Sequence, residues 1–159
     1  HANNANQAID RIINFFPEER RHQLLMDLSL NLKSIISQRL IPTMNGKGRV
    51  PAVEIMLASP HIQDLIFKGD VPMIKESMKK SRDIGMQTFD QALFDLYDDG
   101  SIGYDEAIRN ADSMNELRLQ IKLKSSRVDQ NRPVENGLQG LGLIQDDEPE
   151  QSSSMAEMS

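Results

Sequence analysis

One hairpin signal inside an otherwise helical pattern is the feature that most limits how this chain can fold. Residues 35–41 and 50–57 are rich in Ile, Leu and Val, and the turn sequence Asn45-Gly46-Lys47-Gly48 lies between them. Such a turn favours two antiparallel strands joined directly. The nearly continuous apolar residues Val53, Ile55, Met56 and Leu57 further predict a second strand covered on both faces. We therefore expect helices packed around a single hairpin.

Two helices are expected before the hairpin. The first shows apolar residues at helical spacing, namely Ala5, Ala8, Ile9, Ile12, Ile13 and Phe16. Asn4 and Gln7 have the spacing of a capping box at its start. Pro17 favours the start of a second helix. The expected buried stripe of this second helix consists of Leu24, Leu25, Leu28 and Leu32.

Short helices with clear start and stop signals are expected after the hairpin. Ser59 and Pro60 are typical of a helix start, and Gly69 is typical of a helix end. Two later helices begin with capping-box pairs, Thr88 with Gln91 and Ser113 with Glu116. The pattern predicts a mainly helical second half.

Composition and charge exclude several classes of function. The 159 residues carry a formal net charge of −6, which argues against a protein that binds nucleic acid through a basic face. There is no cysteine, so disulfides and thiolate metal sites are excluded. No apolar run approaches the roughly 20 residues needed to span a bilayer. The polar start has no signal peptide and no initiating Met, so we expect a cytoplasmic chain without membrane insertion that begins inside a longer gene product.

The chain divides into three expected parts. Residues 125–159 hold two basic and seven acidic residues and few large apolar ones, which predicts a disordered acidic tail. Residues 1–58 contain the two expected helices and the hairpin. Residues 59–124 are expected to form a C-terminal helical subdomain.

The usual signatures of a catalytic site are missing. A P-loop requires Gly-x-x-x-x-Gly-Lys-Ser/Thr to cradle phosphates, and Gly46-Lys47-Gly48 has neither this spacing nor the following hydroxyl residue. The three histidines, His1, His22 and His61, are far apart and share no ligand spacing, so no metal site is expected from them.

Residues 95–106 come close to the pattern of a calcium-binding EF-hand loop. The expected positions one, five, six, eight and twelve are occupied by Asp95, Asp99, Gly100, Ile102 and Glu106. Tyr97 stands at position three, where an oxygen ligand is needed, and Gly103 stands at position nine. These departures favour the simpler interpretation of a helix that ends at Gly100, a turn and another helix. A non-enzymatic, protein-binding or calcium-responsive helical module is the alternative from another class of function.

Residues 85–91 resemble a known family. The stretch Gly85-Met86-Gln87-Thr88, followed by Asp90 and Gln91, is similar to the late signature of the PilT/PilU family of type IV pilus retraction ATPases. The resemblance extends from residue 1 to about residue 124. Its further segments are His1-Ala2-Asn3-Asn4-Ala5 at the end of the His box, Ile9-Asp10-Arg11-Ile12-Ile13 with Phe16-Pro17 in the next helix, and Ser37-Gln38-Arg39-Leu40, Gly48-Arg49-Val50 and Glu54-Ile55-Met56-Leu57 in the hairpin.

The resemblance implies the C-terminal portion of a RecA-like P-loop ATPase core, of α/β class but here mainly helical with one β-hairpin. It implies that residues 1–58 end that core and that His1 lies near the γ-phosphate as the catalytic candidate. The full-length protein would be a homo-hexamer that uses ATP and Mg to power pilus retraction and twitching motility. Its implied partners are a PilT-type ATPase and the platform protein of the inner membrane, at the cytoplasmic base of the pilus. The chain alone lacks Walker A and Walker B and is expected to be inactive and without cofactor.

The family's retraction motif reads Ala-Ile-Arg-Asn-Leu-Ile-Arg-Glu. The matching residues here are His61, Ile62, Gln63, Asp64, Leu65, Ile66, Phe67 and Lys68. The three apolar residues are kept, whereas both arginines and the glutamate are replaced, which favours the accessory, PilU-like branch. A functional contribution is then expected from the polar face, which consists of His61, Gln63, Asp64 and Lys68. Pilus-extension and type II secretion ATPases are the alternative within the superfamily, but they usually carry a four-cysteine insert that this chain lacks.

Overall fold

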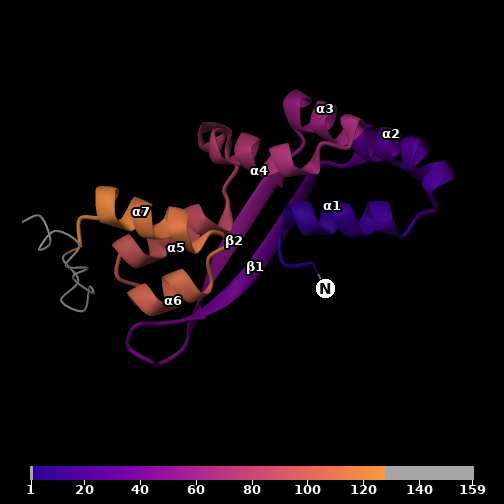
Figure 1. Ribbon diagram of the computed structural model, residues 1–159. Helices are drawn as coiled ribbons and strands as arrows, with labels where there is room; N and C mark the ends of the chain where they lie inside the picture. The colour runs from indigo at the N-terminus through magenta and orange to yellow at the C-terminus, as the bar shows by residue number, and fades with distance from the viewer. Residues whose placement is uncertain (1, 128–159) are drawn as a thin grey trace, which may run out of the picture. The chain divides into compact units, whose positions relative to one another are not determined.

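The computed structural model describes residues 2–127, and its helices are arranged along one long hairpin (Figure 1). Strands β1 (Ser34–Pro42) and β2 (Arg49–Leu57) pair antiparallel without interruption. In the turn, Gly46 has a φ of +67°, in the left-handed region that glycine adopts readily. The side chain of Asn45 accepts a hydrogen bond from Lys47 N at 2.9 Å. The predicted hairpin is therefore confirmed.

The two helices before the hairpin are α1 (Ala5–Asn14) and α2 (Arg21–Asn31), joined through a 3-10 turn at Glu18–Arg20. Asn4 Oδ1 accepts from Gln7 N at 2.9 Å, but Gln7 Oε1 accepts from Asn3 N, so the capping box is only half formed. The leucine stripe expected to be buried on α2 is only partly buried, and Ser29 is the buried residue of that helix. The reason is that α2 packs mainly against one neighbour, α3, and leaves its other sides exposed.

Up to residue 127, five helices follow the hairpin: α3 (Pro60–Lys68), α4 (Val71–Lys79), α5 (Phe89–Asp98), α6 (Tyr104–Arg109) and α7 (Met114–Lys124), with a 3-10 turn at Arg82–Ile84. Both bonds of the predicted Thr88–Gln91 capping box are present at the start of α5. The predicted box of Ser113 and Glu116 is wrong. The amide of Ser113 instead donates to Asp90, and Glu116 pairs with Lys79 at 2.7 Å.

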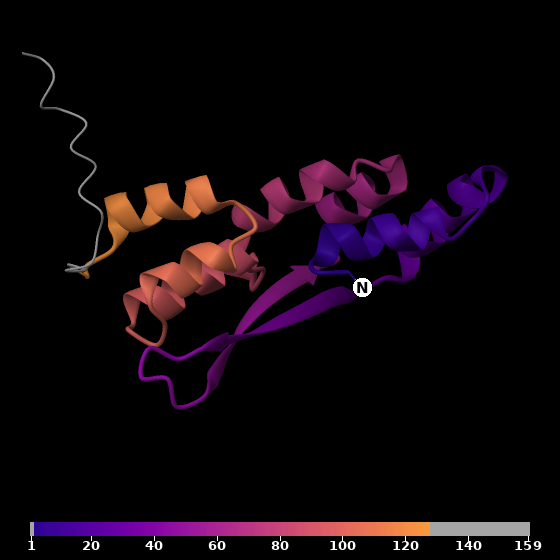
Figure 2. The same cartoon turned by 60° about the horizontal axis from the view of Figure 1, so that its bottom comes forward.

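Buried apolar side chains form two clusters along the hairpin. The base core lies near the open end of the hairpin and consists of Ala5, Ile9, Met56, Ile62, Leu65, Ile66, Val71, Ile74, Met78 and Met86. The turn-side core consists of Ile41, Ala52, Phe89, Ala92, Leu93, Tyr97, Ile102, Ala107, Ile108, Leu117 and Ile121. Figures 1 and 2 show the corresponding arrangement, with α1 to α4 beside one end of the hairpin and α5 to α7 beside the other.

Within residues 2–127 the helices cover one face of the hairpin, and the other face of β2, which was also predicted to be covered, is only partly buried. Along β2, Ala52, Glu54 and Met56 are buried and alternate with less buried neighbours. On the outer face of β1, Ile36 is 68% exposed and Leu40 is 51% exposed. The inner face thus joins the two cores, and Glu54 lies between them.

The expected domain boundary at residue 58 stays a prediction, although the base core takes side chains from both sides of it. The first residues of the expected tail are bound to α5. Ser125 Oγ donates to Asp98 Oδ1 at 2.7 Å, and the Arg127 guanidinium lies 4.9 Å from the ring centre of Tyr97. The rest of that segment lies outside the described residues. Within residues 2–127, no helix has both the length and the apolar character that crossing a membrane would require.

Candidate functional site

The segment that resembles the family's late signature leads into α5 and pairs with β2 through its backbone. Gly85 ends a 3-10 turn with a φ of +95°, and Met86 is fully buried in the base core. Gln87 extends the sheet, because its backbone exchanges hydrogen bonds of 2.8 and 2.9 Å with Ile55. The segment therefore fixes the start of α5 against the hairpin. This is a packing role, and the sequence alone predicted only a loop that enters a capped helix.

Asp90 of the same segment holds the connection between α6 and α7. Its side chain is 3% exposed and accepts the backbone amides of Asp112 at 2.7 Å and Ser113 at 3.0 Å. The signature residue that the sequence could not explain thus fixes the backbone at Asp112.

Glu54 is a functional candidate that sequence reasoning missed. It is 1% exposed, and its carboxylate accepts Ala5 N at 2.8 Å and Phe89 N at 3.3 Å. These are the first amides of α1 and α5, so one carboxylate lies at the positive ends of two helices. The only signal in the sequence was a single acidic residue inside an apolar strand.

Asp112, between α6 and α7, gathers three donors from distant parts of the chain. Its carboxylate accepts from Arg39 Nη2 at 2.6 Å and Asn4 Nδ2 at 3.0 Å, and it forms an ion pair with Lys75 of α4. The Asp112 side chain is 13% exposed, and the side chains of Arg39 and Lys75 are each 21% exposed. Because these ion pairs are largely shielded from water, their partners are held in a more defined geometry than the partners of exposed ion pairs.

Arg39 of β1 completes this group. Its guanidinium donates to Asn110 O at 2.6 Å and Asn3 O at 3.1 Å, and it lies 3.9 Å from the ring centre of Phe89. We call the five charged residues Arg39, Glu54, Lys75, Asp90 and Asp112 the polar junction. It links the first described residues of the chain to the hairpin, α4, α5 and the α6–α7 connection.

The pKa values of the carboxylates in the polar junction are shifted in different directions. Burial raises the pKa of Glu54, although amide hydrogen bonds and the charge of Lys75 act against the shift. Burial likewise raises the pKa of Asp90 against its two amide donors. Burial also tends to raise the pKa of Asp112, but hydrogen bonds from Lys75 and Arg39 outweigh it, so this pKa lies below its usual value.

The retraction-motif match forms helix α3. Ile62, Leu65 and Ile66 are buried in the base core, as their spacing predicts. Asp64 and Lys68 are exposed and pair with each other at 2.7 Å. The polar face is thus a solvent-exposed surface held in place by the three apolar residues.

The remaining residues of the motif match, His61, Gln63 and Phe67, differ in how exposed they are. Gln63 is half-buried, while His61 is exposed like Asp64. Phe67, one of the two arginine replacements, is 44% exposed, and its ring lies edge-on to His22 of α2 with 6.0 Å between ring centres. No pattern in the sequence predicted this aromatic pair.

The acidic residues of the EF-hand look-alike have protein partners. Asp95 pairs with Arg82, and Glu106 pairs with Arg109 at 2.8 Å. Asp99 Oδ1 accepts the amide of Ser101 at 2.8 Å. Across residues 2–127 no three His, Asp or Glu side chains come together in a way that could hold a metal ion.

We expect calorimetry with calcium to show no binding in the micromolar range, because Tyr97 supplies no ligand at position three and the flanking carboxylates are engaged elsewhere. A clear micromolar titration that disappears in Glu106→Gln but persists in Glu116→Gln would overturn this prediction.

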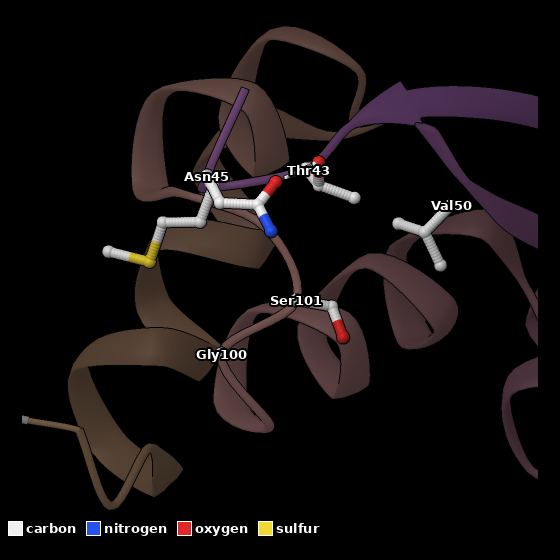
Figure 3. Close-up of a pocket in the computed structure, with 6 residues that line it drawn as sticks. Thr43, Asn45, Val50, Gly100 and Ser101 are labelled. Atoms are coloured by element: carbon white, nitrogen blue, oxygen red, sulfur yellow. Dashed lines mark hydrogen bonds between the residues drawn. The ribbon is translucent and has the colours of Figure 1, made fainter. Parts of the chain in front are cut away.

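The pocket at the hairpin turn does not fit the phosphates of the ATP that the resemblance implies. An open pocket of about 510 Å³ lies between the hairpin turn and the α5–α6 turn (Figure 3), lined by Thr43, Met44, Asn45, Val50, Gly100 and Ser101. None of these side chains is charged, so the pocket offers phosphates no cation. His1, the catalytic candidate, lies outside the described residues. The phosphate cradle would therefore have to come from another part of a full-length protein.

The known proteins similar to this chain include ATPases of type IV pili. It is 54% identical over 150 residues to the type IV pilus ATPase PilU of Pseudomonas aeruginosa, which covers 94% of this chain and 39% of PilU. It is 37% identical over 111 residues to PilT of the same organism, covering 70% of this chain and 32% of PilT. The crystal structure of the pilus retraction motor PilT with bound ADP matches with a TM-score of 0.67 and 34% identity, over 75% of this chain and 33% of that one. No family model matches.

The fold is that of the C-terminal portion of a RecA-like P-loop ATPase, mainly helical with one antiparallel hairpin. Within this class the chain belongs to the PilT/PilU family of type IV pilus retraction ATPases, and it is more similar to PilU than to PilT. The family named from the sequence is thus confirmed. The chain spans about two fifths of PilU and one third of PilT.

Proposed function

We propose that this chain is the C-terminal part of an accessory, PilU-like motor that acts with a PilT-type ATPase to retract type IV pili. The observation that carries the proposal is 54% identity to PilU over 94% of the chain. In the full-length protein, ATP and Mg would be bound by the preceding part of the core. The protein would assemble as a homo-hexamer and work against the platform protein of the inner membrane, on the cytoplasmic side of the pilus base.

Exposed apolar side chains on the outer face of the hairpin favour the proposal that a larger core packs against this chain. Ile36 and Leu40 are exposed there, opposite Ile55 and Pro51 in the register of the strands. Adjacent exposed apolar residues of this kind usually mark a surface that another part of a protein covers. We propose that the preceding part of the ATPase core packs on this face.

The exposed face of α3 is proposed to transmit force. Its sequence resembles the family's retraction motif, and its buried residues hold the helix in place independently of its polar side chains. The exposed Asp64–Lys68 pair adds only about 0.3–0.5 kcal/mol to stability. Changes on this face should therefore act on function more than on folding.

The test is a full-length His61→Ala/Asp64→Ala/Lys68→Ala variant in a background that contains PilT. We expect ATP turnover to be largely retained and retraction under load to be weakened, with the free energy of unfolding changed by about 0.5 kcal/mol or less per site. Glu18→Ala/Glu19→Ala, at two exposed residues of the 3-10 turn, serves as the control. Normal retraction by the triple variant would refute the role of this face, and full-length wild-type protein without ATP turnover would refute the motor assignment itself.

A further inference from the structure

Residues 3–5 are held by side chains from three separate parts of the fold. Arg39 of β1 donates to Asn3 O, Asp112 accepts from the Asn4 side chain, and Glu54 of β2 accepts the amide of Ala5. Asn4 and Asp112 are 108 residues apart in sequence. Three successive residues are thus each fixed by a charged side chain.

The same three side chains hold the helices that follow the hairpin. Glu54 also accepts the first amide of α5, and the Arg39 guanidinium lies over Phe89 of that helix. Asp112 pairs with Lys75 of α4. Residues 3–5 are therefore connected to α4 and α5 through single shared side chains.

Polar contacts replace apolar packing in the middle of the hairpin's inner face. Along β1, Ile35 packs against the base core and Ile41 belongs to the turn-side core, while Ser37 and Arg39 lie between them. Hydrogen bonds in which one partner is charged are shorter and stronger than neutral ones, so they hold residues 3–5 at a defined distance and direction. A displacement of residues 3–5 would therefore move α4 and α5 as well, through the side chains of the polar junction that contact both.

We infer that the polar junction positions residues 3–5 against α4 and α5 and passes movements of the preceding ATPase core to these helices, with Asp112 as the central positioning residue. This inference rests on the proposed function, because it requires a preceding core whose conformation depends on nucleotide. Asp112 is central because it contacts both Asn4 and Lys75, and because Asp90 fixes its backbone.

The chain offers a matched control for Asp112. Lys79 lies one helical turn after Lys75 on α4 and pairs with Glu116 of α7 at 2.7 Å. Glu116 is 50% exposed, against 13% for Asp112, and no described contact links it to residues 3–5. Glu116→Gln thus removes a similar ion pair between the same two regions without touching the junction.

The experiment compares full-length wild-type protein with Asp112→Asn and Glu116→Gln. Hydrogen exchange is measured at the amides of Phe89 and Ser113, with and without ADP or a non-hydrolysable ATP analogue. ATP turnover is measured in parallel. We expect nucleotide to change the exchange rates in the wild type and in Glu116→Gln, but not in Asp112→Asn. We also expect kcat to fall on the order of 10-fold to 100-fold in Asp112→Asn, with little change in KM.

Several outcomes separate positioning from mere stabilisation. If Asp112→Asn lowers the melting temperature but keeps the nucleotide-dependent exchange, the inference is wrong. If Asp112→Asn fails to fold, Lys75→Gln provides the same comparison, because it removes one partner of Asp112 on α4. A wild type that hydrolyses ATP but shows no nucleotide effect at these amides overturns the inference alone. A wild type without ATP turnover overturns the proposed function and this inference together.

Discussion

Replacing Glu54 with alanine is expected to lower the free energy of unfolding by about 2–6 kcal/mol, since each buried amide left without a partner costs about 1–3 kcal/mol. The two amides are those of Ala5 and Phe89, whose residues are 1% and 0% exposed. Urea unfolding followed by circular dichroism measures the change. Glu76→Ala, which removes an exposed partner of Lys79, serves as the control and should shift stability by about 0.5 kcal/mol or less. Equal effects of the two substitutions would show that Glu54 does not hold the two helices.

The pH dependence of the same site has a defined sign. Burial raises the pKa of Glu54 in the folded state, so the folded protein binds a proton more tightly than the unfolded chain does. The stability that protonation of Glu54 contributes is fully present below the pKa of Glu54 in the unfolded chain. It is lost as the pH rises through the pKa of Glu54 in the folded protein. Glu54→Gln removes this titration, so its destabilisation relative to the wild type should be larger at pH 4 than at pH 7. Asp112, whose lowered pKa acts in the opposite direction, is common to both proteins. A difference that shrinks on acidification would contradict the expected shift.

The local structure of this chain could be predicted from its sequence because local rules decide it. Asn45-Gly46 and the flanking apolar residues determine the hairpin, and the Thr88–Gln91 box marks the start of α5. The buried face of α3 also follows from periodicity alone. In each case the residues that interact are close in sequence, so the pattern contains the necessary information.

The polar junction could not be predicted, because its members come together only in the folded chain. Lys75 and Arg39 lie 37 and 73 residues from Asp112 in sequence, and each of the three alone is typical of a solvent-exposed charge. The same limit applies to the burial of β2. Periodicity shows that its residues are apolar, but it does not show which face of the strand the helices cover. The Ser113–Glu116 box fails for a related reason, as two distant partners, Asp90 and Lys79, compete for its groups.

The retraction-motif match shows a different limit. The sequence predicts that all eight residues lie on one helix with Ile62, Leu65 and Ile66 buried, whereas Gln63 of the expected polar face is half-buried. It does not predict the contact between Phe67 and His22, because aromatic pairs between neighbouring helices depend on how the helices pack. The role of the exposed face stays a prediction that only the full-length protein can test.

Replacing Phe89 with alanine is expected to lower the free energy of unfolding by about 3–5 kcal/mol, the range for truncating a buried phenylalanine. Phe89 is fully buried in the turn-side core and is the first residue of α5. Its ring also lies under the Arg39 guanidinium, so its loss opens a cavity and removes a cation–π contact. Phe67→Ala, at a ring that is 44% exposed, should cost much less and serves as the control.

A double-mutant cycle extends this prediction to the junction. Phe89 contributes its amide to Glu54 and its ring to Arg39, so its environment depends on both charged residues. The effects of Phe89→Ala and Arg39→Gln on stability should therefore not add, with a coupling of about 0.5–3 kcal/mol for residues in contact. Phe89→Ala combined with Phe67→Ala should be additive within about 0.5 kcal/mol, because these two rings lie in separate parts of the fold. If both pairs were equally additive, the contact between Arg39 and Phe89 would carry no energy, and Arg39 would act in the junction through its hydrogen bonds alone.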